Sequence, residues 1–231
     1  MIDRARTPVV MCTWRRIDRV PRTLSMLAEQ DEPASLYVWN NNRKEAERLD
    51  AMLSRSPVPA QSVHASRNIG AFGRFYLARD LAPAHRALVF VDDDQDFGSR
   101  MVSDQLASFE PDSLAGWWAF TYRPGARSYA ERDRVETPRG RADYVGTGGL
   151  VADAAIFADP GLFHCPRRFW FVEDLWLSYF AGQVRGWSLR RSLADFSFAV
   201  DDLDIDATMV MTKIRMFRYL KRRGWDVAAP V

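Results

Sequence analysis

The sequence predicts a single α/β domain in which a mostly parallel sheet is flanked by helices. Short apolar runs alternate along the chain with amphipathic stretches, which is the pattern of strands joined by crossover helices. The most apolar run, Ala87 to Val91, is rich in β-branched and aromatic residues and is typical of a strand buried on both faces. Several runs end in polar residues, and open α/β sheets bind ligands outside the carboxyl ends of their strands. We therefore expect a binding site along one edge of the sheet.

Composition excludes several classes of protein. The 231 residues are 47% hydrophobic and 27% charged, which is the balance of a globular domain, and the net charge of +2 indicates no global attraction to nucleic acid or membrane. Cys12 and Cys165 are far apart and form no CxxC motif, which argues against zinc and disulfides and favours a reducing compartment. The first residues lack the apolar segment expected of a signal peptide, and no apolar run reaches the roughly 18 residues that a membrane span needs. We expect a cytoplasmic protein without a transmembrane segment, either free or peripheral at a membrane.

The first elements form a strand, a helix and a second strand. Residues 8–13 predict a buried strand, and residues 20–29 predict a helix with Pro21 in its first turn. Residues 36–39 predict the next strand, which ends in three asparagines at 40–42. Asparagines at this point suit contacts with a base or ribose, and equally suit a turn, because asparagine tolerates left-handed conformations.

A glycine-bearing turn follows the predicted helix at 44–53 and strand at 62–65. The turn spans residues 67–74 and opens a helix that runs to about Leu81. Backbone N–H groups at the start of a helix favour a phosphate, and the arginines of this turn add positive charge. The spacing is neither a Walker nor a dinucleotide fingerprint.

Three aspartates, Asp92 to Asp94, directly follow the most apolar strand. Adjacent carboxylates repel one another, and a divalent cation such as Mg²⁺ or Mn²⁺ would relieve the repulsion. Asp92 and Asp94 lie two residues apart and can face one ion. The alternative is a solvated acidic turn before the helix that starts near Ser99, since acids favour helix N-termini.

The second half begins with that helix, at about 99–109, and a strand-like run at 114–122. The run contains Trp117 and Trp118, for which core packing is the main expectation and sugar stacking the alternative. Residues 123–141 are polar, rich in Arg, Pro and Gly, and without periodicity. A segment of this length inside a compact domain is typically a functional lid or disordered.

A glycine corner and an acid pair come next. Residues 143–151 predict a brief strand, a corner at 146–149 and a return to apolar chain. Glu173 and Asp174 stand between aromatic residues at the start of a helix that runs to about Gln183. A partly dry environment should raise the pKa of Asp174, whereas acids at a first helical turn are also favoured for structural reasons. Trp170 and Trp176 flank the pair, either as core or as a wall for a hexose.

The chain closes with a short strand at 187–189, an acidic run at 201–206 and a basic amphipathic helix at 209–223. The periodicity of this helix predicts that four apolar residues face inward: Met211, Ile214, Phe217 and Leu220.

In their order, these motifs resemble the family 2-type glycosyltransferases of the GT-A fold. The segments that carry the resemblance are PVVMCTWRR, YVWNNN, SRNIGAFGRF, LVFVDDDQDF, GTGGL and FVEDLWLS, and together they cover roughly residues 8 to 190. The resemblance implies transfer of a sugar from a nucleotide-diphosphate donor, UDP- or GDP-linked, with inversion and with Mn²⁺ or Mg²⁺. The acceptor would be a hydroxyl of a glycan, a lipid-linked molecule, a protein or a nucleic acid.

The resemblance also implies roles for individual residues. It places Asp92 and Asp94 on the metal, with Asp93 beside the diphosphate, and gives Asp174 the role of general base, with Glu173 beside it. The remaining matches would line the donor pocket: Thr13 and Arg15 at the nucleotide, Asn40 or Asn41 at the base or ribose, Asn68, Gly70 and Arg74 in the turn beside the nucleotide, and Gly148 and Gly149 beneath the sugar.

Two departures from the family pattern concern the base contact and the metal. The family usually has aspartates where this chain has the asparagines at 40–42, and many relatives supply a late histidine to the metal, whereas the last histidine here is His164. Water, donor phosphates or an acid of the 201–206 run could complete the metal shell.

The resemblance also divides the single domain. It implies a nucleotide-binding half at about 8–100, an acceptor and catalytic half at about 101–195 and a C-terminal extension at about 196–231. Alternatives to glycosyl transfer are a nucleotidyltransferase or other metal-dependent phosphoester enzyme, and a non-catalytic module that binds nucleotide or carbohydrate.

Overall fold

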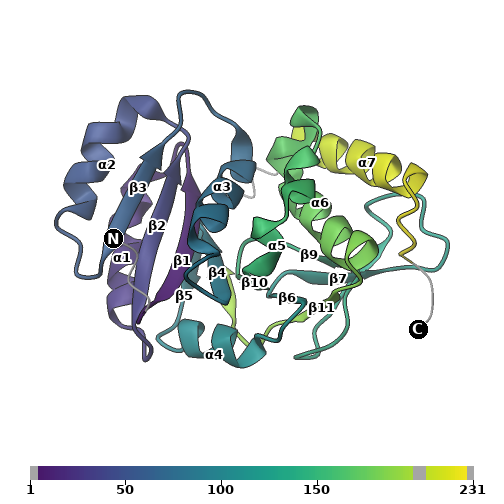
Figure 1. Cartoon of the computed structure of the whole chain (residues 1–231), viewed down its shortest axis with the longest axis horizontal. Coiled ribbons are helices and arrows are strands. Elements are labelled where there is room, and N and C mark those ends of the chain that lie inside the picture. The colour runs from purple at the N-terminus through teal and green to yellow at the C-terminus, as the bar shows by residue number, and fades with distance from the viewer. Residues whose placement is uncertain (1–4, 200–206, 228–231) are drawn as a thin grey trace.

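The computed structural model describes residues 5–199 and 207–227, which form an α/β domain around a seven-stranded, mostly parallel sheet (Figure 1). The strand order is β11-β6-β10-β4-β1-β2-β3. Strands β1 to β4 are parallel, β10 is antiparallel to both of its neighbours, and β11 is parallel to β6. The bounds are β1 (Thr7–Thr13), β2 (Ala34–Asn40), β3 (Ala60–His64), β4 (Ala87–Asp92), β6 (Ser113–Gly116), β10 (Leu150–Asp153) and β11 (Ser188–Arg191). The predicted fold class is confirmed.

Helices cover both faces of this sheet. They are α1 (Val20–Ala28), α2 (Ala46–Leu53), α3 (Gly73–Leu81), α4 (Met101–Ser108), α5 (Ala155–Ala158), α6 (Glu173–Tyr179), which continues as a π-helical turn (Phe180–Val184), and α7 (Ala207–Arg222). The period-2 alternation of each strand divides the core into two layers. Leu88 and Phe90 of β4 face the layer of α3, α5, α6 and α7, whereas Val89 and Val91 face the layer of α1, α2 and α4. Figure 1 shows α3, α5 and α6 on the viewer's side of the sheet.

Two small sheets flank the large one. In the first, β5 (Gln95–Phe97) pairs with β12 (Phe196–Phe198), and in the second, β7 (Ala119–Tyr122) pairs with β8 (Arg132–Arg134) and β9 (Tyr144–Val145). The expected single strand at 114–122 is therefore wrong, because β6 and β7 belong to different sheets. The chain changes sheet at Trp117 and Trp118, whose backbone groups bond to Gly149 and Gly146 of the glycine corner.

The segment at 123–141, predicted to be without regular structure, contains β8. Its backbone pairs with β7, and Tyr129 is buried against Tyr144. Part of this segment is therefore an ordered component of the second small sheet.

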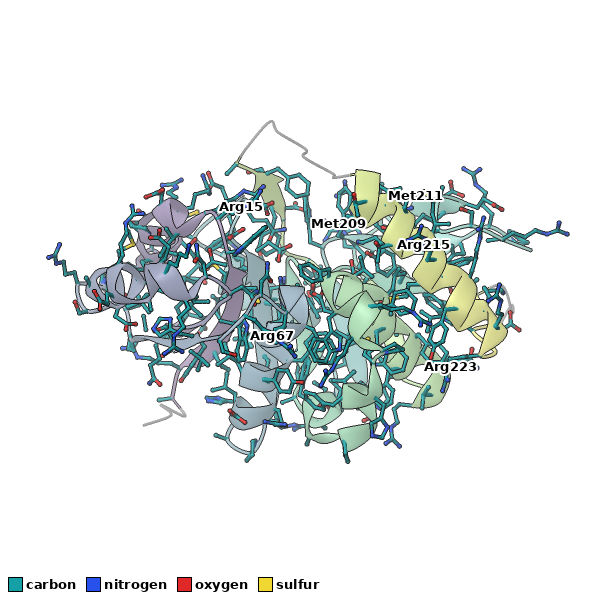
Figure 2. All side chains as sticks on the ribbon, turned by 90° about the horizontal axis from the view of Figure 1, so that it is seen from above. Arg15, Arg67, Met209, Met211, Arg215 and Arg223 are labelled. Carbon is teal, nitrogen blue, oxygen red and sulfur yellow. The ribbon has the colours of Figure 1, made fainter. Side chains whose placement is uncertain are left out.

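Helix α7 packs through one stripe of its surface. Met216, Phe217 and Leu220 are fully buried, and Lys213 lies at the same helical phase. Met211, which was expected to face inward, is 47% exposed, because it precedes Lys213 by two residues and so points to the opposite side. Figure 2 shows Met209, Met211 and Arg215 along this helix.

The register of the parallel strands aligns their polar ends. Asp92 of β4 is paired with Cys12 of β1, Thr13 of β1 with Asn40 of β2, and Asn40 with His64 of β3. The carboxyl ends of four parallel strands thus meet along one edge, as expected for a ligand site in an open sheet. Within the described ranges, no helix combines the length and hydropathy needed to cross a membrane.

Candidate active site

The three aspartates end β4 and form the tight turn into β5. Asp92 is the last residue of β4, Asp93 and Asp94 make the turn, and the side chain of Gln95 accepts a hydrogen bond from the Asp92 N–H at 2.9 Å. Arg19 stabilises the turn, since its Nε donates to the Asp93 carbonyl at 3.1 Å and its Nη2 pairs with Asp96 at 2.6 Å. The backbone of the turn is therefore fixed while the side chains of the triplet stay partly exposed.

The negative charge of this acidic turn (Asp92 to Asp94) is only partly balanced by protein cations. Arg16 Nη1 lies 3.5 Å from Asp93 and 3.3 Å from Asp94. Burial and the charges of Asp92 and Asp93 raise the pKa of Asp94 to about 6. Burial also raises the pKa of Asp93, against the opposing effect of the Thr13 hydroxyl.

The acidic turn suits a hard divalent cation. Its side chains offer carboxylate oxygens, which such ions prefer, and their mutual repulsion would fall on binding. Among residues 5–199 and 207–227, no group of three or more His, Cys, Asp or Glu side chains is arranged to hold a metal. The acidic run at 201–206, expected as a possible source of a further ligand, lies outside the described residues. Asp92 and Asp94 fit as a two-carboxylate site whose remaining positions water or a ligand would fill.

Arg74 connects the acidic turn to the acid pair. Its side chain is only 4% exposed, with Nη2 at 2.7 Å from Asp92 Oδ1 and Nε at 3.8 Å from Glu173 Oε1. Burial works against its charge, but Asp92 and Glu173 outweigh this effect and raise its pKa. Nη1 is buried without a hydrogen-bond partner within the described part of the chain. Asp92 and Glu173, which are 81 positions apart in sequence, thus share one cation.

The glycine corner closes over Asp92. A Cβ at Gly148 would overlap the Asp92 carboxylate, so only glycine fits between the corner and the acidic turn. The Gly149 N–H donates a hydrogen bond to the Phe90 carbonyl of β4 at 3.0 Å, and the Thr147 hydroxyl donates to Glu173 Oε1 at 2.8 Å. The corner, the acidic turn and the acid pair, which the sequence predicts separately, therefore lie together.

The turn at 67–74 packs against the segment that precedes the acid pair. Asn68 Oδ1 accepts a hydrogen bond from the Gly70 N–H at 2.8 Å. Gly70 has φ +70°, and a Cβ there would lie 2.8 Å from the Trp170 carbonyl. Phe72 stacks on Trp170 with ring centroids 5.2 Å apart. These contacts fix the position of the turn relative to Glu173 and Asp174.

The two asparagines that were expected at a base or ribose are buried and hydrogen-bonded inside the protein. Asn40 bonds to the Asn42 backbone and to His64. Asn41 Nδ2 donates to the Gly70 carbonyl at 2.9 Å, while its Oδ1 accepts from Ile69 N–H at 3.1 Å. Their contact with a nucleotide gains no support from this geometry, which gives Asn41 a role in holding the 67–74 turn instead.

Thr13 and Arg15, both expected at the nucleotide, differ in their exposure to solvent. Thr13 is buried beside the Asp93 carboxyl, whereas Arg15 is exposed and its guanidinium lies 4.0 Å from the ring centre of Trp14. Figure 2 shows Arg15 and the exposed Arg67 on the N-terminal part of the ribbon. Arg15 and Arg67 are available to an anion from solvent.

The two acids of the acid pair (Glu173 and Asp174) have opposite electrostatic surroundings. Burial raises the pKa of Glu173 to about 7, although Arg74 opposes the shift. Burial also acts on Asp174, but the charge and hydrogen bond of Lys213 outweigh it, with help from the Tyr144 hydroxyl, and the net pKa is lowered. The expectation of a raised pKa at Asp174 is therefore wrong, because α7 brings a cation to it.

Several residues of the site were missed from the sequence. Tyr144, Thr147 and Lys213 each bond to one acid of the pair, and Arg16 pairs with the acidic turn. Of these four, only Lys213 could have been found from the sequence pattern, because it is a charged residue at a position of α7 where the helical periodicity predicts an apolar one.

The tryptophans flanking the acid pair pack in the core. Trp176 is buried, and its Nε1 donates to the Leu162 carbonyl at 2.6 Å, while Trp170 is stacked on Phe72. A separate cavity of about 590 Å³ lies between β11, the π-helical turn and the C-terminal residues of the described chain, with Trp187 and Trp225 among its walls. It includes no residue of the acidic turn or the acid pair.

Comparisons with known proteins identify the fold. No family model and no curated protein matches the sequence. GalNAc-T7, solved with UDP, GalNAc and Mn²⁺, is similar with a TM-score of 0.57 at 13% identity, covering 84% of this chain and 44% of that one. S. aureus TarS 1–349 in complex with UDP is similar with a TM-score of 0.56 at 14% identity, covering 81% and 57%. A longer structure of TarS has a TM-score of 0.53 at 16% identity, covering 90% and 39%.

The chain thus spans about two fifths to three fifths of the length of these structures. Both neighbours are glycosyltransferases of the GT-A type, and the resemblance inferred from the motifs is confirmed for the fold. The protein has a GT-A fold.

Proposed function

We propose that this protein is a glycosyltransferase that moves a sugar from a nucleotide-diphosphate donor to an acceptor hydroxyl with inversion. The observation that carries the proposal is the ion-paired connection Asp92–Arg74–Glu173, which brings the acidic turn, the glycine corner and the acid pair to one edge of the sheet. The GT-A fold supports it, as do the UDP and Mn²⁺ named for its structural neighbours. The donor would be UDP- or GDP-linked.

The acidic turn would hold the donor diphosphate through a divalent cation, Mn²⁺ or Mg²⁺, ligated by Asp92 and Asp94. When bound, the cation supplies the positive charge that stabilises a leaving diphosphate. Arg16 and Arg74 stand beside it and add fixed positive charge. Gly148 and Gly149 would lie beneath the sugar, and the lack of a side chain at Gly148 lets the corner approach Asp92 closely.

The acid pair would carry the proton transfer. An acceptor hydroxyl is a weak nucleophile until a positioned carboxylate takes its proton, and inversion requires that carboxylate on the face of the sugar opposite the leaving group. We assign this step to Asp174, whose lowered pKa keeps it ionised at neutral pH. Glu173, bonded to Thr147 and paired with Arg74, would orient the donor side of the site.

This assignment gives each part of the chain a task. Residues of about 8–100 would bind the nucleotide, those of about 101–195 would bind the acceptor and supply the base, and those of about 196–231 would form an extension that supports the acid pair.

The test is to identify the product released from a panel of nucleotide sugars with Mn²⁺, with donors first selected by thermal shift. Release of nucleoside diphosphate that requires an acceptor supports the proposal. Release of pyrophosphate would instead indicate nucleotidyl transfer, and binding without any product would indicate a nucleotide- or carbohydrate-binding module. The matched control is the Asp92→Asn variant, which should lose product release with every donor that the wild type uses.

A further inference from the structure

Lys213 reaches from α7 to the acid pair. Its Nζ lies 2.7 Å from Asp174 Oδ2 and donates to the Tyr144 hydroxyl at 3.1 Å. The Tyr144 hydroxyl in turn donates to the same Asp174 oxygen. The side chains of Lys213 and Asp174 are only 17% and 12% exposed, so water screens their attraction little.

Every oxygen of the Asp174 carboxylate is held. Oδ2 accepts from Lys213 and Tyr144, and Oδ1 accepts from the Leu175 N–H at 2.9 Å. Three elements, β9, α6 and α7, meet at this one carboxylate. Its orientation and its charge are therefore set by the N–H of the next residue and by two side chains, of Tyr144 and Lys213, that lie far from it in sequence.

The groups next to the Lys213–Asp174 ion pair are mostly aromatic or acidic. The Lys213 ammonium lies 5.4 Å from the ring centre of Tyr129 and 5.6 Å from that of Tyr144, distances that allow cation–π attraction. Tyr122 of β7 and Glu173 of α6 also interact electrostatically with Asp174 or Lys213, and two further cations lie beyond them: Arg132, whose guanidinium is 3.6 Å from the Tyr129 ring centre, and Arg74 beside Glu173. Within the described residues, Lys213 is the cation that directly pairs with Asp174.

Anchoring α7 does not require a charge at this position. Met216, Phe217 and Leu220 are fully buried, and Trp225 and Val227 continue the contact beyond the helix. A buried ion pair stabilises a fold little better than apolar side chains of similar volume, because both charges lose their hydration. The charge of Lys213 therefore acts on Asp174 and adds little to the attachment of the helix.

We propose that Lys213 is a positioning residue for proton transfer, which holds the Asp174 carboxylate ionised and oriented and makes α7 part of the reaction centre. The inference rests on the proposed function and deepens it, because it gives the C-terminal extension a defined task. Lys213 would act through its contact with Asp174 and not on the donor or the acceptor.

The test compares Lys213→Met, which keeps an apolar stem and removes the charge, with Lys213→Arg and with Arg215→Met. Arg215 is an exposed basic residue on the same helix (Figure 2), which makes it a matched control. Lys213→Met should lower kcat by about 10-fold or more with unchanged donor affinity in calorimetry. The acid limb of its pH–rate profile should move upward by at least about one unit, since a nearby opposite charge shifts a carboxyl by that much.

Lys213→Arg should recover part of kcat, and Arg215→Met should match the wild type. Tyr144→Phe, which removes one hydrogen bond to the same oxygen, should shift the acid limb in the same direction by less, and provides the measurement should Lys213→Met not fold. A loss of kcat that only follows the loss of folded protein, with an unmoved acid limb, would show a purely structural role and overturn the proposal.

A readout without turnover separates this inference from the proposed function. The Asp174 carboxyl, followed by carbon NMR in substrate-free protein, should titrate at higher pH in Lys213→Met than in the wild type. If the wild type transfers sugar but the pKa of Asp174 is the same in Lys213→Met as in the wild type, the inference alone is wrong. If the titration responds but the wild type transfers no sugar with any donor, both the proposed function and the positioning role are overturned, and the ion pair alone remains.

Discussion

The acidic turn and the acid pair are both clusters of neighbouring carboxylates, yet the protein treats them differently. At the turn, three acids have partly exposed side chains, and the pKa of Asp94 is raised to about 6. At the pair, each acid is buried beside a cation: Glu173 beside Arg74, which it shares with Asp92, and Asp174 beside Lys213. The acidic turn therefore keeps negative charge that a bound ligand can neutralise. In the acid pair, the cationic side chains of the protein balance the charge and fix the orientation of the carboxylates.

The largest expected effect is on the acid pair. Asp174→Asn is nearly isosteric and should keep donor binding, but it should lower the transfer rate by about 10²–10⁴-fold, because the variant cannot accept the proton. Steady-state kinetics with calorimetry of donor binding measures both. Glu173→Gln is the matched control and should retain more activity. Near-normal turnover of Asp174→Asn beside an inactive Glu173→Gln would assign the base to Glu173.

The next effect concerns the acidic turn. Asp94→Ala should weaken Mn²⁺-dependent binding of nucleoside diphosphate by at least about 100-fold, since it removes a direct metal ligand. Isothermal calorimetry with and without chelator measures this. Asp96→Ala, two residues further along in β5 and paired with Arg19, should leave the affinity nearly unchanged. Equal affinity in Asp94→Ala and the wild type would show that Asp94 does not bind the metal. The acidic turn and the acid pair would then not differ in the way proposed.

The two acids of the pair should also give the folded protein opposite pH dependences. Glu173 has a pKa of about 7 in the folded state against an ordinary 4.5, so the folded protein holds a proton that the unfolded chain releases. The free energy of unfolding should therefore fall by about 3 kcal/mol as pH rises from about 4.5 to 7, and Glu173→Gln should lack this fall.

Asp174 acts in the other direction. Its folded pKa is lowered, so its contribution is present above 3.8 and is lost as pH falls below that value. Urea unfolding of the wild type and both variants between pH 3 and pH 8 measures the two slopes. Parallel pH profiles for Glu173→Gln and the wild type would contradict the assigned protonation of the pair.

The smallest expected effect is in the segment at 123–141. We propose that its part around Tyr129, which packs on Tyr144 beside the acid pair, closes further over bound donor or acceptor, as lids do to exclude water. Amide hydrogen exchange at 123–131 should slow a few-fold with donor, acceptor and metal, whereas β3 amides should not change. Unchanged exchange at saturation would leave the segment a static part of its small sheet.

The fold was predictable because it depends on local pattern. Each strand of β1 to β4 is a short apolar run with a polar end, and each crossover helix follows at the expected spacing, so the parallel register brought Asp92 and Thr13 to one edge. The break at Trp117 and Trp118 was missed, because an apolar run that changes sheet looks like one strand when only its composition is known.

The electrostatics of the site were not predictable in the same way. The pKa of Asp174 depends on Lys213, which lies 39 residues later and reaches it only through the packing of α7. Arg74 was expected at a phosphate, and the structure shows that it pairs with acids of two separate motifs. Such partners are chosen by tertiary contacts, and their sequence positions carry no local pattern.

The neutral side chain at Asn41 has a consequence for control of the site. Its side-chain amide donates a hydrogen bond to the Gly70 carbonyl and accepts one from the Ile69 N–H. An ionised aspartate can only accept hydrogen bonds and could not form both. An amide also has no protonation state to change. The loop that begins α3 is therefore attached to the sheet by a connection insensitive to acidity, in the midst of carboxylates that titrate. Protonation of the neighbouring carboxylates would therefore leave the bonds between the 67–74 turn and Asn41 unchanged.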